Sequence, residues 1–146
     1  MEYLMPCLCA FAACCAFSLT YNIHWKRIFP VCFGGALGWF IYLLLKDYGD
    51  VFAYFAATVV ISVYAEIMAR VCKVPVIVFL TTAILPLVPG IGLYRAMSAM
   101  GQGDMLTGAK TAVHAMSLIL MIVMGTGIGS ALFTLRKVPA QKEETL

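Results

Sequence analysis

The chain has 146 residues, of which 63% are hydrophobic and 12% charged, and its formal net charge is +3. A soluble domain carries about a quarter charged residues, so this composition, with a mean hydropathy of +0.96, excludes a soluble catalytic domain and predicts a polytopic membrane protein. The small positive charge gives no support to nucleic-acid binding.

The first half of the chain contains three apolar runs. Each has about the length of a bilayer span, which takes about 20 residues. The first covers residues 3–21. No basic stretch precedes it, so we interpret it as a retained span and not as a cleaved signal. The second and third cover residues 28–45 and 51–71, and short polar turns separate them. Each run is predicted to form one transmembrane helix.

The fourth apolar segment, residues 76–100, is interrupted by Pro86, Pro89, Gly90 and Gly92. Proline removes a backbone donor and clashes with the preceding turn, so an unbroken helix is excluded. In lipid the freed backbone groups have no water to bond, and such a break is tolerated only inside protein or beside a water-filled cavity. Broken helices of this kind form substrate sites in transporters. The segment therefore predicts a transport-type membrane protein.

The last span is predicted from Thr111 to Leu135, after a polar turn at residues 101–104. Residues 136–146 form a polar cytoplasmic tail, so the expected organisation is one transmembrane domain, residues 1–135, followed by this tail. The expected fold class is all-α: a polytopic membrane helix bundle with four to five transmembrane helices, one of them broken by proline and glycine.

The basic residues predict the orientation, because cytoplasmic loops carry an excess of Lys and Arg. If the turn after the first span is cytoplasmic, seven basic residues fall inside: Lys26, Arg27, Arg70, Lys73, Arg136, Lys137 and Lys142. This arrangement has an outside N-terminus, five crossings and an inside C-terminus. A broken segment that re-enters without crossing would place the C-terminus outside, which the basic tail disfavours. Four aromatic residues fit interfacial belts: Trp25, Trp39, Tyr48 and Tyr94.

The chemistry-bearing residue types form no known enzymatic or metal-binding pattern. The six cysteines have no CxxC spacing and no metal-like pairing with histidine, so they are predicted to be buried free thiols. A nucleophile motif and a phosphate loop are also missing from the sequence. We therefore predict no enzymatic activity, no metal and no cofactor.

Small residues at GxxxG spacing occur in two spans, at Gly34–Gly38 and at Gly125–Gly129. Such spacing lets two helices approach closely in a membrane. Both stretches are predicted to be tight packing faces.

Glu66 is the ionisable residue deepest in the third span, where it shares one helix face with Thr58, Ser62 and Arg70. An ionisable residue inside a span is costly and is a functional candidate by default. Glu66 forms a structural pair with Arg70 four residues later, or the two act in coupling or gating beside a polar pathway. Both alternatives stay open.

His114 shares a face with Lys110 and Ser117 near the start of the last span. A histidine changes charge near neutral pH, so His114 relays a proton or binds an anion in one interpretation. In the other it is a hydrogen-bonded histidine of the bundle.

Arg95 follows Gly90 by five residues. Its forked guanidinium suits a carboxylate, so Arg95, together with Pro86, Pro89, Gly90 and Tyr94, is predicted to bind substrate. The alternative is an anchor at the outer interface.

The block Pro86-Leu87-Val88-Pro89-Gly90, followed by Tyr94-Arg95-Ala96-Met97, resembles the threonine/serine exporter family, as do Ala69-Arg70 and Lys73-Val74-Pro75. The length and span order are similar to the small-subunit branch, where a short polytopic chain works with a second, larger membrane subunit. The resemblance covers about residues 19–135. It implies export of small carboxylates, either threonine and serine or, in the split branch, a dicarboxylate such as succinate.

Two functional hypotheses follow. The first is a multi-pass subunit of an exporter of small organic acids in the bacterial cell inner membrane, which acts with the larger subunit or as a homo-oligomer. The second is an accessory or scaffolding subunit that stabilises a partner holding the whole pathway. An intramembrane enzyme is disfavoured because the sequence shows no catalytic pair.

Overall fold

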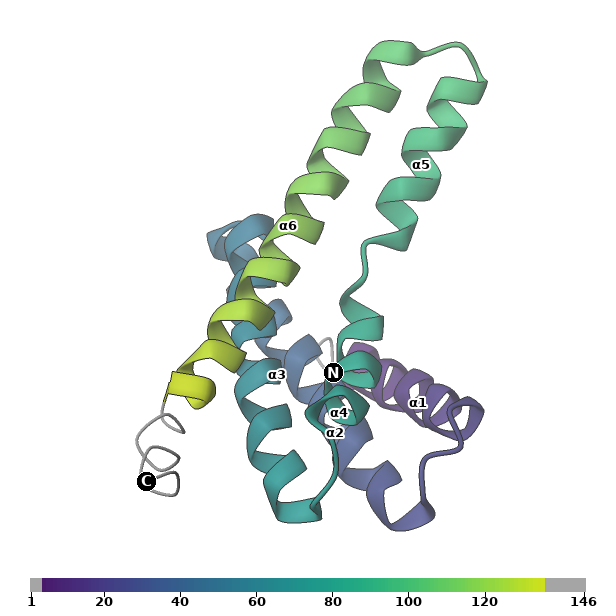
Figure 1. Cartoon of the computed structure of the whole chain (residues 1–146). Helices are drawn as coiled ribbons and strands as arrows, with labels where there is room; N and C mark the ends of the chain where they lie inside the picture. The colour runs from purple at the N-terminus through teal and green to yellow at the C-terminus, as the bar shows by residue number, and fades with distance from the viewer. Residues whose placement is uncertain (1–3, 136–146) are drawn as a thin grey trace, which may run out of the picture.

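The computed structural model describes residues 4–135, and all regular structure in this part of the chain is helical (Figure 1). In chain order the elements are α1 (Leu4–Thr20), α2 (Trp25–Leu45), the 3-10 turn η1 (Lys46–Tyr48), α3 (Asp50–Cys72), α4 (Val76–Ile84), the 3-10 turn η2 (Leu85–Leu87), α5 (Gly90–Gly101) and α6 (Met105–Leu135). The predicted tail, residues 136–146, lies outside the described residues.

The helices confirm the expected all-α polytopic bundle. In the described part, α2, α3 and α6 are each long and apolar enough to cross a membrane. The α4–α5 pair passes the same criterion as one bent span, which gives three or four candidate spans. The apolar helix α1 is shorter, with 17 residues.

Two helices begin earlier than predicted. α2 begins at Trp25 instead of Ile28, because the basic and aromatic turn continues directly into the helix. α6 begins at Met105 instead of Thr111. The reason is a cap: Asp104 Oδ1 accepts a hydrogen bond of 3.1 Å from the Thr107 amide, which satisfies a free donor of the first turn.

The chain runs up and down through neighbouring helices. α1 packs on α2, α2 on α3, and α4 on both α2 and α3, while α6 packs on α3 and α5. α5 continues away from α4 after the break and does not fold back along it (Figure 1). Together α5 and the part of α6 that precedes His114, residues 90–113, form a helical hairpin that projects beyond the other helices (Figure 1). We call this hairpin the arm.

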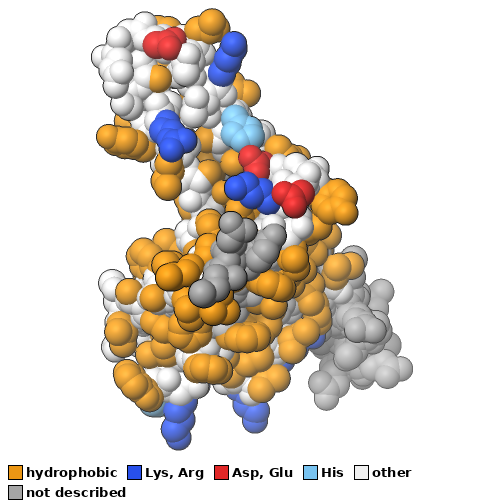
Figure 2. All heavy atoms as spheres, turned by 180° about the vertical axis from the view of Figure 1, so that it is seen from behind, with side chains coloured by type: hydrophobic (Ala, Val, Ile, Leu, Met, Phe, Trp, Pro, Cys, Tyr) orange, Lys and Arg blue, Asp and Glu red, His pale blue; other side chains and the backbone are white. Residues whose placement is uncertain are grey.

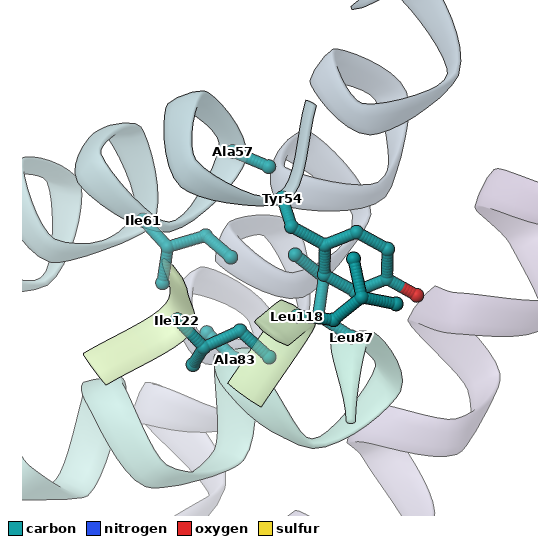
Figure 3. Close-up of a cluster of buried hydrophobic side chains, with 7 residues drawn as sticks. All are labelled: Tyr54, Ala57, Ile61, Ala83, Leu87, Leu118 and Ile122. Carbon is teal, nitrogen blue, oxygen red and sulfur yellow. The ribbon is translucent and has the colours of Figure 1, made fainter. Parts of the chain in front are cut away.

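Two apolar clusters hold the bundle together. The larger joins α3, α4, η2 and α6 (Figure 3) and consists of Tyr54, Ala57, Ile61, Ala83, Leu87, Leu118 and Ile122. The second joins α2, α3 and α4 and consists of Val31, Ala65, Ala69 and Phe79. Leu87, which belongs to the break, is fully buried. The break is therefore part of the core.

The predicted glycine faces pack tightly, as expected. A Cβ added at Gly125 would collide with Thr58, and one at Gly129 would collide with Ser62, so this face of α6 is pressed against α3. A Cβ at Gly38 would likewise collide with Ile61 across the α2–α3 contact. Close helix approach through small residues is thus confirmed in both stretches.

The outer surface fits a membrane environment. Figure 2 shows hydrophobic side chains over the wide part of the molecule, with Lys and Arg at one end and charges of both signs toward the narrow part. The start of α2, the end of α3 and the start of α4 lie at the same end (Figure 1), which brings four of the predicted cytoplasmic basic residues together: Lys26, Arg27, Arg70 and Lys73. The other three, Arg136, Lys137 and Lys142, lie outside the described residues.

All six cysteines are free thiols. Cys14 and Cys32 are buried as expected, whereas Cys9 is exposed and the others are partly buried. The Cys15 Sγ donates to the Cys32 Sγ over 2.9 Å, and the Cys14 Sγ donates to the Thr82 carbonyl over 3.4 Å. These thiols act as small packing groups between α1, α2 and α4.

Candidate functional site

The proline and glycine residues break the fourth segment where the sequence predicts. Pro86 lies in η2, Val88 is extended (φ −62°, ψ 125°), and the two helical parts meet at a bend of 48°. The Val88 amide bonds to the Leu85 carbonyl at 3.2 Å and the Gly90 amide to the Val88 carbonyl at 2.8 Å. These short turns replace the regular helix bonds that the two prolines prevent.

The break has one buried and one open side. Leu87 and Pro89 are buried, whereas Val88 and Gly90 are exposed. The Leu87 methyl group lies 3.6 Å from the position that a Cβ on Gly38 would occupy, so α2 passes the break at Gly38. The protein therefore encloses the irregular backbone on the core side, as a membrane requires.

A hollow of about 340 Å³ lies beside the break. Its lining comes from α1, α2 and η2: Pro6, Cys9, Ala10, Ala13, Trp39 and Pro86. Trp39, for which the sequence predicts an interfacial position, is partly buried and packs against the larger apolar cluster. Its Nε1 is closed to solvent and has no hydrogen-bond partner.

Tyr94 and Arg95 lie on the exposed side of α5, in the arm. The Tyr94 side chain is 72% exposed. Arg95 is exposed as well, and within residues 4–135 it has no ion pair. Both side chains follow the break by about one helical turn, and both are available to a ligand or to another subunit.

Glu66 and Arg70 form the i,i+4 ion pair that the sequence offered as the structural alternative. The Arg70 Nη2 lies 3.5 Å from the Glu66 Oε2. The Arg70 guanidinium also stacks over the Phe133 ring of α6, with its Cζ 4.7 Å from the ring centroid. Glu66 is 12% exposed and Arg70 45%, so the pair lies where α3 meets α6 near the basic end of the bundle.

From this ion pair, the polar face of α3 continues along the contact between α3 and α6. Thr58 and Ser62 are fully buried. The Ser62 hydroxyl donates to the Thr126 carbonyl over 3.1 Å and lies 3.3 Å from the Ser130 hydroxyl. These polar residues therefore share one face of α3, as predicted, and this face is hydrogen-bonded to α6.

His114 lies at the opposite end of the α3–α6 contact, beside Asp50. The His114 Nε2 is 3.9 Å from the Asp50 Oδ2, and both side chains are about half exposed. This contact is an ion pair only when the imidazole is protonated. The two residues line a hollow of about 630 Å³ between the start of α3 and α6, together with Tyr48, Phe52, Phe55, Met121 and Met124.

The structure divides the predicted site residues into four places. Pro86, Pro89 and Gly90 form the break, while Tyr94 and Arg95 lie farther along on the arm. Glu66 with Arg70, and His114 with Asp50, lie toward the two ends of the α3–α6 contact. Within residues 4–135, Arg95 makes no hydrogen bond or ion pair with Glu66 or His114.

The sequence did not predict the contacts of two residues whose side chains can take part in binding or proton transfer. Asp50 was assigned to a turn, and its contact with His114 depends on the pairing of α3 with α6 over 64 residues of sequence. Trp39 was assigned to an interface because tryptophan is common there. A signal for Trp39 existed: it follows Gly35 by four residues and therefore lies close to the same helix face as this glycine.

The fold and these contacts define a class of protein: a multi-pass helical membrane protein with a proline- and glycine-broken helix built into its core, as in transport proteins. The comparison with protein families is more specific. The sequence model of the family described as "Threonine/Serine exporter, ThrE" matches residues 6–132. The chain therefore belongs to the threonine/serine exporter family, which confirms the resemblance carried by the Pro86–Met97 block. A search of curated proteins and a search of solved structures gave no match.

Proposed function

We propose that this chain is one subunit of an exporter of small organic acids in the bacterial inner membrane, with threonine and serine or a dicarboxylate such as succinate as substrate. The observation that carries the proposal is the break at residues 86–90, half enclosed in the core of a chain from an exporter family. A break of this kind presents helix ends and unpaired backbone groups to a substrate. The protein is a transporter in this proposal and has no enzymatic step.

Arg95 is the proposed carboxylate ligand. Every small molecule considered carries a carboxylate, and the guanidinium can donate two parallel hydrogen bonds to it. Arg95 has no partner among the described residues that would compete with a substrate. An unpaired arginine on a membrane helix faces a water-filled path or another subunit, because lipid around it is costly.

We propose that His114 couples transport to proton movement and that Glu66 with Arg70 gates the transport pathway. Protonation of His114 creates a charge attraction to Asp50 that neutral imidazole lacks. This switch would act at the outer end of α3. Glu66 and Arg70 would open and close the other end of the same helix contact.

A second subunit completes the pathway in this proposal. α5 packs mainly on α6, and the arm leaves several large apolar side chains uncovered, among them Ile91 (72% exposed), Met97 (74%) and Val113 (71%). The three or four candidate spans of the described residues offer few walls to enclose a path. The proposed partner is a larger membrane subunit of the same family, with a homo-oligomer as the other outcome.

Efflux from preloaded cells tests the proposal. Cells express this chain alone, the chain with its larger partner, the partner alone, or neither, and efflux of threonine, serine and succinate is followed in each. Efflux that requires both chains supports a split exporter and names its substrate. Efflux with this chain alone supports a homo-oligomer. If no condition gives efflux while both proteins are folded in the membrane, the proposed export of these substrates is wrong.

The alternative is an accessory subunit that stabilises a partner holding the whole pathway. The contacts of the polar face favour it, since Glu66 pairs with Arg70 and Ser62 bonds to α6, as packing groups do. Two variants separate the proposals, Glu66→Gln and Arg95→Ala. A loss of transport at unchanged partner level supports a transport role, whereas a parallel loss of partner and transport supports the scaffold.

A further inference from the structure

A hollow of about 350 Å³ lies between α1 and α2, near the basic end of the bundle. The helix break, the arm and the two ion pairs contribute no residue to it. Its lining consists of Phe11, Cys15 and Leu19 from α1 and of Trp25, Ile28 and Phe29 from α2. The hollow is therefore separate from the sites described above.

This hollow has an aromatic mouth and a closed inner wall. Trp25 is 78% exposed and Phe29 is 69% exposed. The Phe29 ring meets the Phe11 ring across the two helices, with a centroid distance of 6.1 Å. On the inner side, the Cys15 Sγ bonds to the Sγ of Cys32, which is fully buried. The hollow is thus a slot that the bundle closes on one side and that opens at the outer surface of α1 and α2.

The dimensions of the slot suit a hydrocarbon chain. Between Phe11 and Leu19 it extends along about 12 Å of α1, at a rise of about 1.5 Å per residue. A helix of another protein chain is about 10–12 Å across, which is too wide for about 350 Å³ over this length. The lining carries no charge, so an apolar chain that enters the slot displaces no charged group from water.

A cation lies beside the mouth of the slot. Lys26 directly follows Trp25, and it is a surface neighbour of Phe29, three residues later on the same helix. Its side chain is exposed and has no ion pair within residues 4–135. A lysine in this position extends its apolar stem along the protein and keeps its ammonium group in the polar layer. Its charge is therefore available to the head of a molecule whose chain lies in the slot.

The surroundings of Lys26 are positive as well. Arg27 and Lys73 lie at the same end of the bundle, and Figure 2 shows Lys and Arg gathered at one end. Among the described carboxylates, only Glu66 lies near this end, and it is paired with Arg70. A molecule seated in the slot meets uncompensated positive charge at the mouth, which selects an anionic head group.

We propose that the slot between α1 and α2 binds an anionic phospholipid, with one acyl chain between Phe11 and Trp25 and the phosphate beside Lys26. Trp25 then lies at the boundary between chain and head group, where tryptophan is common. Basic pockets between membrane helices on the cytoplasmic side suit such head groups. A zwitterionic phospholipid offers the same chains without net charge and should bind more weakly. This inference does not depend on the export function.

Fluorescence quenching tests the site, because the chain contains two tryptophans, Trp25 and Trp39, and Trp39→Phe leaves Trp25 as the single emitter. The purified full chain is reconstituted in phosphatidylcholine vesicles with increasing fractions of phosphatidylglycerol or phosphatidylcholine brominated on the acyl chains, since bromine quenches a neighbouring indole. We expect half-maximal quenching at an about fivefold lower fraction of the phosphatidylglycerol, as one cation near an anionic lipid predicts. The wild-type signal minus that of Trp25→Phe gives the same comparison without the Trp39 substitution.

Two pairs of variants separate the charge from the slot. Lys26→Gln should bring the two brominated lipids to nearly the same half-maximal fraction, whereas Lys110→Gln, which removes an exposed cation of the arm, should keep the difference. Phe29→Ala removes an aromatic wall of the slot and should reduce the difference although Lys26 is present. Phe40→Ala is its control, because Phe40 is an exposed phenylalanine of the same helix outside the slot.

Three results overturn the inference. The first is equal quenching by the two brominated lipids, or a difference that Lys26→Gln leaves unchanged. The second is a difference that persists in full in Phe29→Ala, because the lipid would then gather at the basic end without entering the slot. The third is a Trp25 that neither lipid quenches, because another protein chain would then cover the slot.

Discussion

Charged side chains in this chain fall into two groups according to their surroundings. Glu66 and Arg70 satisfy each other at 3.5 Å, and Arg70 also stacks on Phe133. Arg95 has no partner within residues 4–135. A charged side chain that has no partner within the fold is the better candidate for binding a ligand, because its hydrogen-bonding groups are available to another molecule.

Replacing Arg95 with alanine should reduce export by about tenfold to a hundredfold, since hydrogen bonds to a charged group contribute about 1.5–3 kcal/mol. Efflux per molecule of membrane-inserted protein is the measurement. Lys110→Ala is the matched control, because Lys110 is also an exposed cation of the arm and should be dispensable. Normal export by Arg95→Ala would exclude Arg95 as the carboxylate ligand.

Asp104 gives a prediction on pH dependence at the tip of the arm. The hydrogen bonds from Thr107 lower the pKa of the Asp104 carboxyl below its ordinary value of 3.8. A lowered folded-state pKa means that this cap stabilises α6 at neutral pH and is lost as the pH falls below 3.8 and through the lowered pKa. We expect faster hydrogen exchange of the Thr107 amide, corrected for intrinsic rates, in acid than at neutral pH.

Two variants control that measurement. Asp104→Ala should exchange fast at both pH values because the acceptor is gone, whereas Asp104→Asn keeps a capping oxygen and should not depend on pH. Equal protection in the wild type and Asp104→Ala at neutral pH would contradict the cap.

Residue types and spacing predicted some of these contacts and not others. The Glu66–Arg70 pair was among the predicted alternatives because residues four apart on one helix are neighbours on its surface. The His114–Asp50 contact was not, because it joins two helices whose pairing no local pattern encodes. Trp39 has a similar limit: amphipathic aromatic character indicates an interface but does not say which side of a helix is enclosed.

At the scale of elements, the α3–α6 contact is a close approach of two helices through glycine. A Cβ at Gly125 would meet Thr58, and one at Gly129 would meet Ser62, with backbone carbonyls of α3 close behind. We expect Gly125→Ala and Gly129→Ala each to destabilise the protein by about 1–3 kcal/mol, the usual effect of overpacking. Unfolding of the purified protein in a denaturing detergent series measures the change.

Gly127 supplies the matched control within the same helix. A Cβ at Gly127 meets nothing within 4 Å, so Gly127→Ala should be neutral or stabilising by up to about 1 kcal/mol, since alanine is the better helix former. If all three substitutions have the same effect, general helix propensity decides the stability and the tight face does not.

Helix boundaries show where sequence patterns are weak. The break was located correctly because two prolines forbid regular helix whatever surrounds them. Apolar character alone predicts the starts of α2 and α6 too late, because both helices begin in partly polar sequence. Trp25–Arg27 and Met105–Lys110 are helical although they are partly polar, and the Asp104 cap was the overlooked signal.

At the scale of the molecule, the chain has a bundle and an arm. The bundle buries the break, while the arm exposes apolar residues such as Ile91 and Met97 together with Arg95. Sequence alone predicted an all-helical bundle, but it predicted four to five transmembrane helices where the described residues contain three or four candidate spans. The length of the arm beyond α2 and α3 depends on how α6 is placed against α3, which only the three-dimensional packing determines.

The orientation of the whole molecule can be tested from both sides of the membrane. The ends of α2, α3 and α4 that carry Lys26, Arg27 and Lys73 lie together (Figure 1), and positive residues favour the cytoplasm. Because α5 continues away from α4 with a bend of only 48°, the turn at the tip of the arm should lie outside. An impermeant maleimide should therefore label Gln102→Cys in intact cells and Lys26→Cys only after permeabilisation.

The wild-type protein, with its six native cysteines, provides the background labelling for both variants. Labelling of both positions from the outside would mean that residues 76–101 do not cross, because the two variants would then lie on one side of the membrane. Labelling of Lys26→Cys alone from the outside would invert the whole orientation. In either case Arg95 would no longer follow the break toward the outer face, and the proposed orientation would be wrong.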